Sequence, residues 1–137
     1  MDTQLHILAL AGLLQVLQIA LMAIPANLEL GPKATTGPRD PQDIPGGNPQ
    51  LLMSRRTGRL HRAMTNHFEA LILFTIATLA VTLTTSTSPL TLACGWLYLA
   101  ARLLYIPAYA LAWTPWRSLF WALGLLATTI MLLAALA

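Results

Sequence analysis

The chain has 137 residues, of which 56% are hydrophobic and only 9% are charged, whereas a soluble domain carries roughly 25% charged residues. Together with a mean hydropathy of +0.64, this composition excludes an ordinary soluble domain. The net charge of +3 comes from sparse basic residues, which do not form a nucleic-acid-binding patch. We therefore predict a single membrane domain over residues 1–137, in contact with lipids and without a nucleic-acid partner.

The first predicted element is an apolar helix over about residues 5–28, in which Gln15 and Gln18 are the only strongly polar interior residues. Its length suits a hydrocarbon core of ~30 Å, which takes ~20 helical residues to cross. A signal peptide is disfavoured, because Asp2 stands where a basic residue is expected and the apolar stretch is too long. We expect a retained transmembrane helix.

A long loop follows, over about residues 29–58. Residues 31–50 contain four glycines and five prolines, a composition that disfavours both helix and strand. We expect this segment to be extended and to lack regular structure.

Three further apolar segments, at about residues 60–84, 89–113 and 115–137, are each long enough to cross the same hydrocarbon core. In hydrocarbon every backbone N–H and C=O must be paired within its own segment, so these segments are expected to be helices. Ser88-Pro89 and Thr114-Pro115 each place a hydroxyl at an N-cap and a proline at the first helical position. The short connections make neighbouring helices antiparallel. The sequence thus predicts an all-α integral membrane protein, a bundle of four transmembrane helices.

The basic residues indicate how the helices are oriented. One side of the predicted membrane carries Lys33, Arg39, Arg55, Arg56, Arg59, Arg62 and Arg117. The other side, which holds both chain ends and the connection at residues 84–88, has no Lys or Arg. By the positive-inside rule, the long loop is cytoplasmic and both termini lie on the non-cytoplasmic side.

The second helix carries a polar stripe at membrane depth. Arg59, Arg62, Asn66 and Glu69 follow one another at helical spacing and fall within roughly an 80° arc. An acid such as Glu69 costs about 2.5–3.5 kcal/mol in the middle of a membrane. We therefore expect Glu69 to face protein rather than lipid, and to approach a guanidinium.

The third helix offers such a guanidinium. Its polar and aromatic residues Tyr98, Arg102, Tyr105, Tyr109 and Trp113 also share roughly an 80° arc. Arg102 lies in the middle of the apolar segment, where a charge is most costly. We predict a structural ion pair between Glu69 and Arg102.

Arg117 and Ser118 occupy the first turn of the fourth helix, on the cytoplasmic side. A helix N-terminus offers unpaired N–H groups and partial positive charge, so an anion or a thiolate could be stabilised there. With the polar stripes of the second and third helices, these residues predict a guanidinium-rich pocket for a small, multiply charged anion.

Other interpretations stay open for several of these residues. Arg55, Arg56 and Arg59 would also serve to anchor a helix at anionic headgroups, and Trp113 fits an interfacial aromatic belt. The stripe of the second helix would also serve as purely structural pairing with Arg102. The histidines do not share a helix face at metal-binding spacing, so no metal or haem site is expected.

The stretch from Arg59 to Glu69, RLHRAMTNHFE in one-letter code, resembles the signature of the MAPEG family, membrane-associated proteins in eicosanoid and glutathione metabolism. The segment from Ala101 to Tyr109, followed by Arg117-Ser118, is similar to the third and fourth helices of that family. Residues 37–40, Gly-Pro-Arg-Asp, are similar to bacterial members. The resemblance covers nearly the whole chain.

The resemblance implies a homotrimer in the bacterial inner membrane, with glutathione bound between subunits near the cytoplasmic face. It implies that Arg117 stabilises the catalytic thiolate that attacks a lipophilic electrophile or reduces a peroxide. The residues expected to contact glutathione are Arg59, Arg62, Asn66, Glu69, Tyr105, Tyr109 and Ser118.

Two functions therefore stand as hypotheses. The first is a glutathione-dependent transferase or peroxidase that acts on a membrane-dissolved substrate. The second is a non-catalytic membrane subunit of a larger assembly, or a lipid-binding protein, that keeps the fold. Thr65, Tyr105 and Trp121 depart from residues that characterised members often carry at these places, and this favours the second hypothesis.

Overall fold

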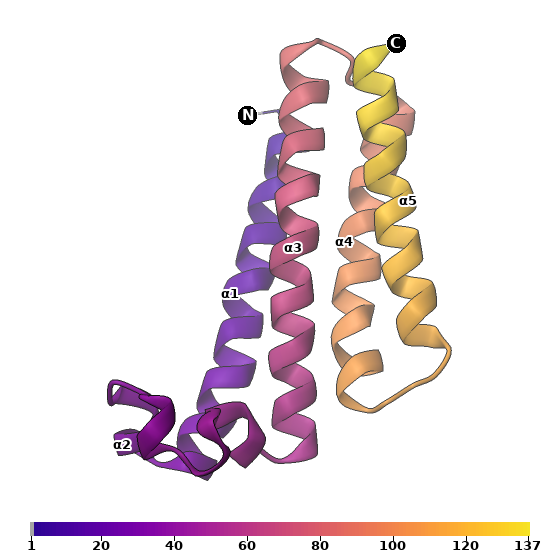
Figure 1. The fold of residues 1–137 in the computed structure, drawn as a ribbon. Coiled ribbons are helices and arrows are strands. Elements are labelled where there is room, and N and C mark those ends of the chain that lie inside the picture. Colours follow the sequence, from indigo (N-terminus) through magenta and orange to yellow (C-terminus); the bar gives the residue numbers. More distant parts are fainter. Residues whose placement is uncertain (1) are drawn as a thin grey trace.

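A computed structural model describes residues 2–137 and shows an all-helical bundle (Figure 1). Four helices are long and apolar enough to cross a membrane: α1 (Thr3–Leu30), α3 (Arg55–Leu83), α4 (Pro89–Ala110) and α5 (Trp116–Leu136). The two chain ends lie at one end of the bundle, and the long loop and the α4–α5 connection lie at the other. The predicted fold class, a four-helix integral membrane protein, is confirmed.

The long loop is more regular than its composition predicts. It contains a short helix, α2 (Pro32–Thr36), and three 3-10 turns, Pro41–Asp43, Pro45–Gly47 and Pro49–Leu52. The expectation of no regular structure is therefore wrong. Each short element begins with a proline, a position where the missing N–H costs no hydrogen bond and the fixed φ suits a helix.

The two ends of the loop are tied together by one carboxylate. Glu29, near the end of α1, accepts hydrogen bonds from the backbone N–H of Ser54 at 2.9 Å and from its hydroxyl at 2.8 Å. It also accepts one from the hydroxyl of Thr57 at 2.6 Å. Ser54 in turn caps α3 by accepting from the Thr57 N–H. These contacts let α3 begin at Arg55, five residues before the predicted start at residue 60.

Two helices are followed by a residue that is not glycine but has a positive φ angle, in the left-handed region. After α3, Thr85 has φ 56°, and after α4, Ala112 has φ 55°. At the end of α4 the N–H groups of Ala112 and Trp113 donate to the carbonyls of Tyr109 and Ala108, which is the Schellman pattern of helix termination. This pattern ends α4 at Ala110, three residues before the predicted end at residue 113.

The two predicted Pro-led helix starts behave differently. Ser88 caps α4 as predicted, with its hydroxyl accepting from the Thr91 N–H and the Thr91 hydroxyl accepting from the Ser88 N–H. At α5, however, Pro115 itself is the N-cap and no side chain among residues 2–137 caps the helix, so the predicted role of Thr114 is wrong. The proline lies just outside the helix, where it has no side-chain oxygen with which to accept from an N–H.

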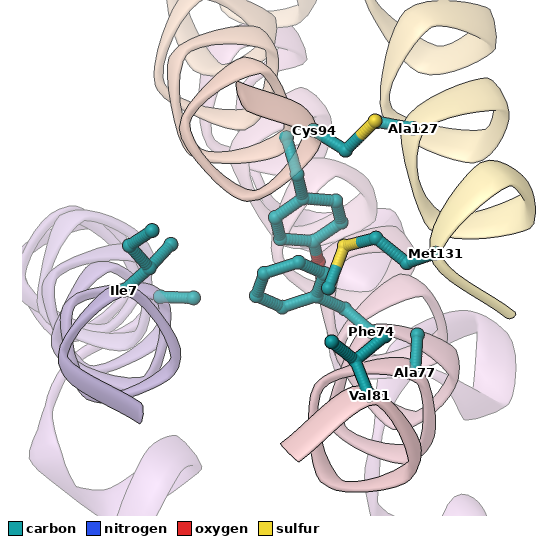
Figure 2. Close-up of a cluster of buried hydrophobic side chains, with 9 residues drawn as sticks. Ile7, Phe74, Ala77, Val81, Cys94, Ala127 and Met131 are labelled. Atoms are coloured by element: carbon teal, nitrogen blue, oxygen red, sulfur yellow. The ribbon is translucent and has the colours of Figure 1, made fainter. Parts of the chain in front are cut away.

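The hydrophobic core takes buried side chains from all four long helices (Figure 2). Phe74 of α3 stacks on Tyr98 of α4, with ring centroids 3.8 Å apart and planes within 3°. The other members are Ile7, Ala11, Ala77, Val81, Cys94, Ala127 and Met131. Gly95 lets α1 approach α4 closely, because a Cβ at this residue would lie 3.1 Å from the Ile7 side chain. Large apolar residues on the outside of the bundle are exposed, as expected where lipid is the solvent.

Candidate functional site

A polar cleft of about 350 Å³ opens at the end of the bundle that carries the long loop. We call it the outer cleft; it is lined by Gln50, His61, Arg62, Thr65, Asn66, Glu69, Tyr105, Tyr109 and Arg117. It draws together α3, the last turns of α4 and the first turn of α5. Six of the residues predicted for the site therefore meet in one place.

Two predicted residues do not line this cleft. Arg59 points elsewhere, with its Nη1 donating to the carbonyl of Ala110 at 3.5 Å. Ser118 is exposed on the first turn of α5. Its place at the helix start, next to Arg117, does not direct its side chain into the cleft of a single chain.

Tyr109 organises the cationic part of the outer cleft. Its hydroxyl accepts a hydrogen bond from Nε of Arg62 at 3.2 Å. The guanidinium of Arg117 lies 5.0 Å from the centre of the Tyr109 ring, and that of Arg62 lies 5.8 Å from it. Tyr105 packs edge-on against Tyr109, with centroids 5.5 Å apart. Cation–π contact holds the two guanidiniums near one another, and both are left with donors for an anionic ligand.

The N–H groups at the start of α5, which were expected to be free, donate hydrogen bonds to backbone carbonyls. The N–H of Arg117 donates to the carbonyl of Trp113 at 3.1 Å. The N–H groups of Ser118 and Leu119 donate to the carbonyl of Pro115, at 3.1 and 3.2 Å. The expectation that free helix N–H groups help to stabilise an anion here is therefore wrong for these three residues. The guanidinium of Arg117 is the group that can do so.

Arg102 takes Asn66 as its hydrogen-bond partner in place of the predicted Glu69. It is 1% exposed, donates from Nη2 to Oδ1 of Asn66 at 2.9 Å, and lies 4.3 Å from the centre of the Tyr105 ring. The side chain of Glu69 is exposed in the single chain, so the prediction of a buried ion pair with Arg102 is wrong. Asn66, one turn before Glu69 on α3, accepts the hydrogen bond that was expected for the carboxylate.

A second cavity of about 200 Å³ lies deeper in the bundle, between α3, α4 and α5. We call it the inner cavity; it is lined by Asn66, Glu69, Ala70, Leu73, Tyr98, Arg102, Trp121, Gly124, Leu125 and Thr128. Asn66 and Glu69 line both the inner cavity and the outer cleft. The two spaces are therefore neighbours along α3.

Sequence reasoning missed a buried polar cluster between α1 and α3. His67 is fully buried, and its Nδ1 lies 2.6 Å from Oε1 of Gln15 and 2.9 Å from Nε2 of Gln18. The sequence signal for this cluster is the pair Gln15 and Gln18 in the first helix, because polar side chains at membrane depth need partners. His67 gives no such signal, because it lies off the polar stripe of α3.

Comparison with protein families identifies the chain. The sequence pattern of the MAPEG family matches residues 7–137, nearly the whole chain. Comparisons with curated proteins and with solved structures gave no match. The family contains glutathione-dependent transferases and peroxidases, and its membership agrees with the four apolar helices of an integral, multi-pass membrane protein. The family match and the fold together show that this chain belongs to the MAPEG family.

Proposed function

We propose that the protein is a glutathione-dependent transferase or peroxidase that acts on a lipophilic electrophile. The observation that carries this proposal is the charge pattern of the outer cleft, in which Arg62 and Arg117 lie around Tyr109 and Glu69 lines the same cleft. Glutathione carries two carboxylates, one ammonium group and a thiol. Two guanidiniums and one carboxylate complement those permanent charges and leave the thiol for chemistry.

The residues of the outer cleft would divide the work between binding and catalysis. Arg62 and Asn66 offer donors for the carboxylates and peptide of glutathione, and Glu69 offers an acceptor for its ammonium group. Arg117 would stabilise the thiolate, since a nearby guanidinium favours the charged form of a thiol. The thiolate then attacks a substrate that reaches the site from the lipid. At an electrophilic carbon it forms a C–S bond and displaces a leaving group as an anion. At a peroxide it breaks the O–O bond, releases an alkoxide that takes up a proton, and becomes a sulfenic acid that a second glutathione reduces to give the disulfide and water.

Binding of glutathione is the first test of this proposal. We expect purified protein to bind glutathione saturably and to show the ultraviolet absorption of a bound thiolate. Arg62→Ala should raise the dissociation constant about tenfold or more, since a hydrogen bond to a charged group contributes about 1.5–3 kcal/mol. Arg56→Ala is the matched control, because Arg56 is an exposed arginine of the same helix outside the cleft. Wild-type protein without binding or thiolate would remove the enzyme hypothesis and favour a non-catalytic membrane subunit.

We also propose that the chain works as a homotrimer in a bacterial inner membrane, with its long loop in the cytoplasm. The exposure of Arg62 and Glu69 in the single chain supports the assembly. The basic residues of the loop, among them Lys33 and Arg39, support its cytoplasmic side. A charge left in contact with acyl chains costs about 2.5–3.5 kcal/mol, and a neighbouring subunit would cover it. Polar contacts of this kind drive helix association where lipid supplies no hydrophobic drive.

Native mass spectrometry in mild detergent should therefore show three copies per particle. Replacing Glu69 by Leu removes the charge that a neighbouring subunit would cover, and is expected to lower the proportion of trimer. Leu83→Ala, at the far end of α3, should leave this proportion unchanged. Particles that contain one copy at every protein concentration would contradict the proposed assembly.

A further inference from the structure

Two residues that line the inner cavity have a buried side-chain donor without a hydrogen-bond partner among residues 2–137. Tyr98 and Arg102 are each 1% exposed, and both line the cavity. Within residues 2–137, neither the hydroxyl of Tyr98 nor Nε of Arg102 makes a hydrogen bond. Buried polar atoms are almost always paired in folded proteins, so each exception calls for an explanation. Two such exceptions on adjacent turns of one helix, beside one cavity, indicate a site for an acceptor.

The rest of the lining indicates what kind of molecule carries that acceptor. Leu73 of α3 and Trp121 and Leu125 of α5 contribute apolar surface. Gly124 leaves room, since a Cβ there would lie 3.5 Å from Cδ of Arg102 and 3.7 Å from Cδ2 of Tyr98. An apolar body and one oxygen acceptor would match this arrangement.

The charges of the inner cavity favour an uncharged acceptor. Arg102 and Glu69 both line the cavity, and their opposite charges balance. A carboxylate or phosphate that entered would place a second anion near Glu69 in surroundings of low dielectric, where like charges repel strongly. A carbonyl oxygen has two lone pairs and accepts two hydrogen bonds without adding charge.

We propose that the inner cavity binds an apolar molecule with an uncharged carbonyl group, whose oxygen accepts hydrogen bonds from the Tyr98 hydroxyl and from Nε of Arg102. Because Asn66 and Glu69 line both spaces, the bound carbonyl compound would lie beside glutathione. Its role as the second substrate rests on the proposed function, but its binding does not.

The test uses two probes that differ only at the carbonyl, and contains no glutathione. The probes are 4'-bromobutyrophenone and 1-bromo-4-butylbenzene, titrated against the purified protein while tryptophan fluorescence is recorded. Bromine quenches a tryptophan that it touches, and Trp121 lines the cavity. Trp121→Phe should therefore remove most of the saturable quenching, although the other tryptophans remain.

Tyr98→Phe tests whether the hydroxyl contacts the carbonyl of the probe. Partitioning of the probe into detergent is the same for wild type and variant, so it does not affect the comparison. It should weaken binding of the ketone about fivefold, the effect of one lost hydrogen bond, and leave the alkylbenzene within about twofold. The variant keeps the ring that stacks on Phe74 and loses only a hydroxyl that makes no hydrogen bond within residues 2–137, so its thermal midpoint should be no lower than that of wild type. Gly124→Ala takes room from the cavity and should weaken both probes alike.

Three outcomes would overturn the proposal. The first is an absence of saturable quenching in wild-type protein. The second is quenching that persists in Trp121→Phe. The third is an equal response of the two probes to Tyr98→Phe, including no response of either, because the hydroxyl would then have no contact with the carbonyl. None of these outcomes depends on whether the protein binds glutathione.

Discussion

Replacing Arg117 by Ala is expected to lower the rate of glutathione conjugation about a hundredfold or more, the usual cost of removing one group that stabilises a developing or reacting anion. The dissociation constant of glutathione should change by less than about threefold, because an interaction made mainly with the reacting anion is expressed in the rate. The three N–H groups at residues 117–119 already donate to backbone carbonyls, so they cannot substitute for the guanidinium.

The measurement combines a conjugation assay on a generic aryl halide with the ultraviolet absorption of the bound thiolate. Arg117→Lys keeps a positive charge and should retain part of the rate and of the thiolate signal. Arg56→Ala, outside the outer cleft, should match wild type in both. If Arg117→Ala loses binding and turnover in the same proportion, Arg117 is a binding residue, and the assigned catalytic role is wrong.

The second large effect concerns stability. Asn66→Leu should lower the free energy of unfolding by about 2–3 kcal/mol, because it removes the hydrogen-bond partner of a buried charge. Arg102 is 1% exposed and donates to Oδ1 of Asn66 at 2.9 Å. The double variant Asn66→Leu with Arg102→Met should recover most of the loss, since an apolar pair of similar size needs no partner.

Unfolding of the four variants of this cycle, followed in mixed detergent micelles, gives the coupling energy between Asn66 and Arg102. Gln42→Leu serves as a control, because Gln42 lies in the long loop and is exposed. Additive effects of the two substitutions would show that Arg102 does not depend on Asn66, and that its charge is satisfied elsewhere.

The sequence predicts those parts of the fold that depend on local chemistry. The length of the apolar segments is enough to predict four transmembrane helices, and Ser88-Pro89 marks the start of α4 as predicted. The ends at Thr85 and Ala112 could not be predicted in this way. Their positive φ angles occur without glycine, and the hydrogen bonds of the Schellman pattern compensate for that unfavourable conformation.

The site was predictable at the level of helix faces, but not at the level of individual contacts. The helical spacing of Asn66 and Glu69 places them on one stripe of α3, and both line the outer cleft and the inner cavity. Which of them meets Arg102 depends on how α3 and α4 are rotated against one another, and packing of the whole bundle sets that rotation. For the same reason the pairing of His67 with residues of α1 could not be read from the sequence of either helix.

The clamp formed by Glu29 with Ser54 and Thr57 makes the long loop a closed module. Because the exit of α1 and the entry of α3 are joined at the base of the loop, the chain between them does not have to hold the two helices together. Changes within the loop should therefore cost the packing of the long helices little, as in surface loops generally. Loss of the Glu29 carboxylate, by contrast, would release both ends of the loop at once, because Ser54 and Thr57 share it as their hydrogen-bond acceptor.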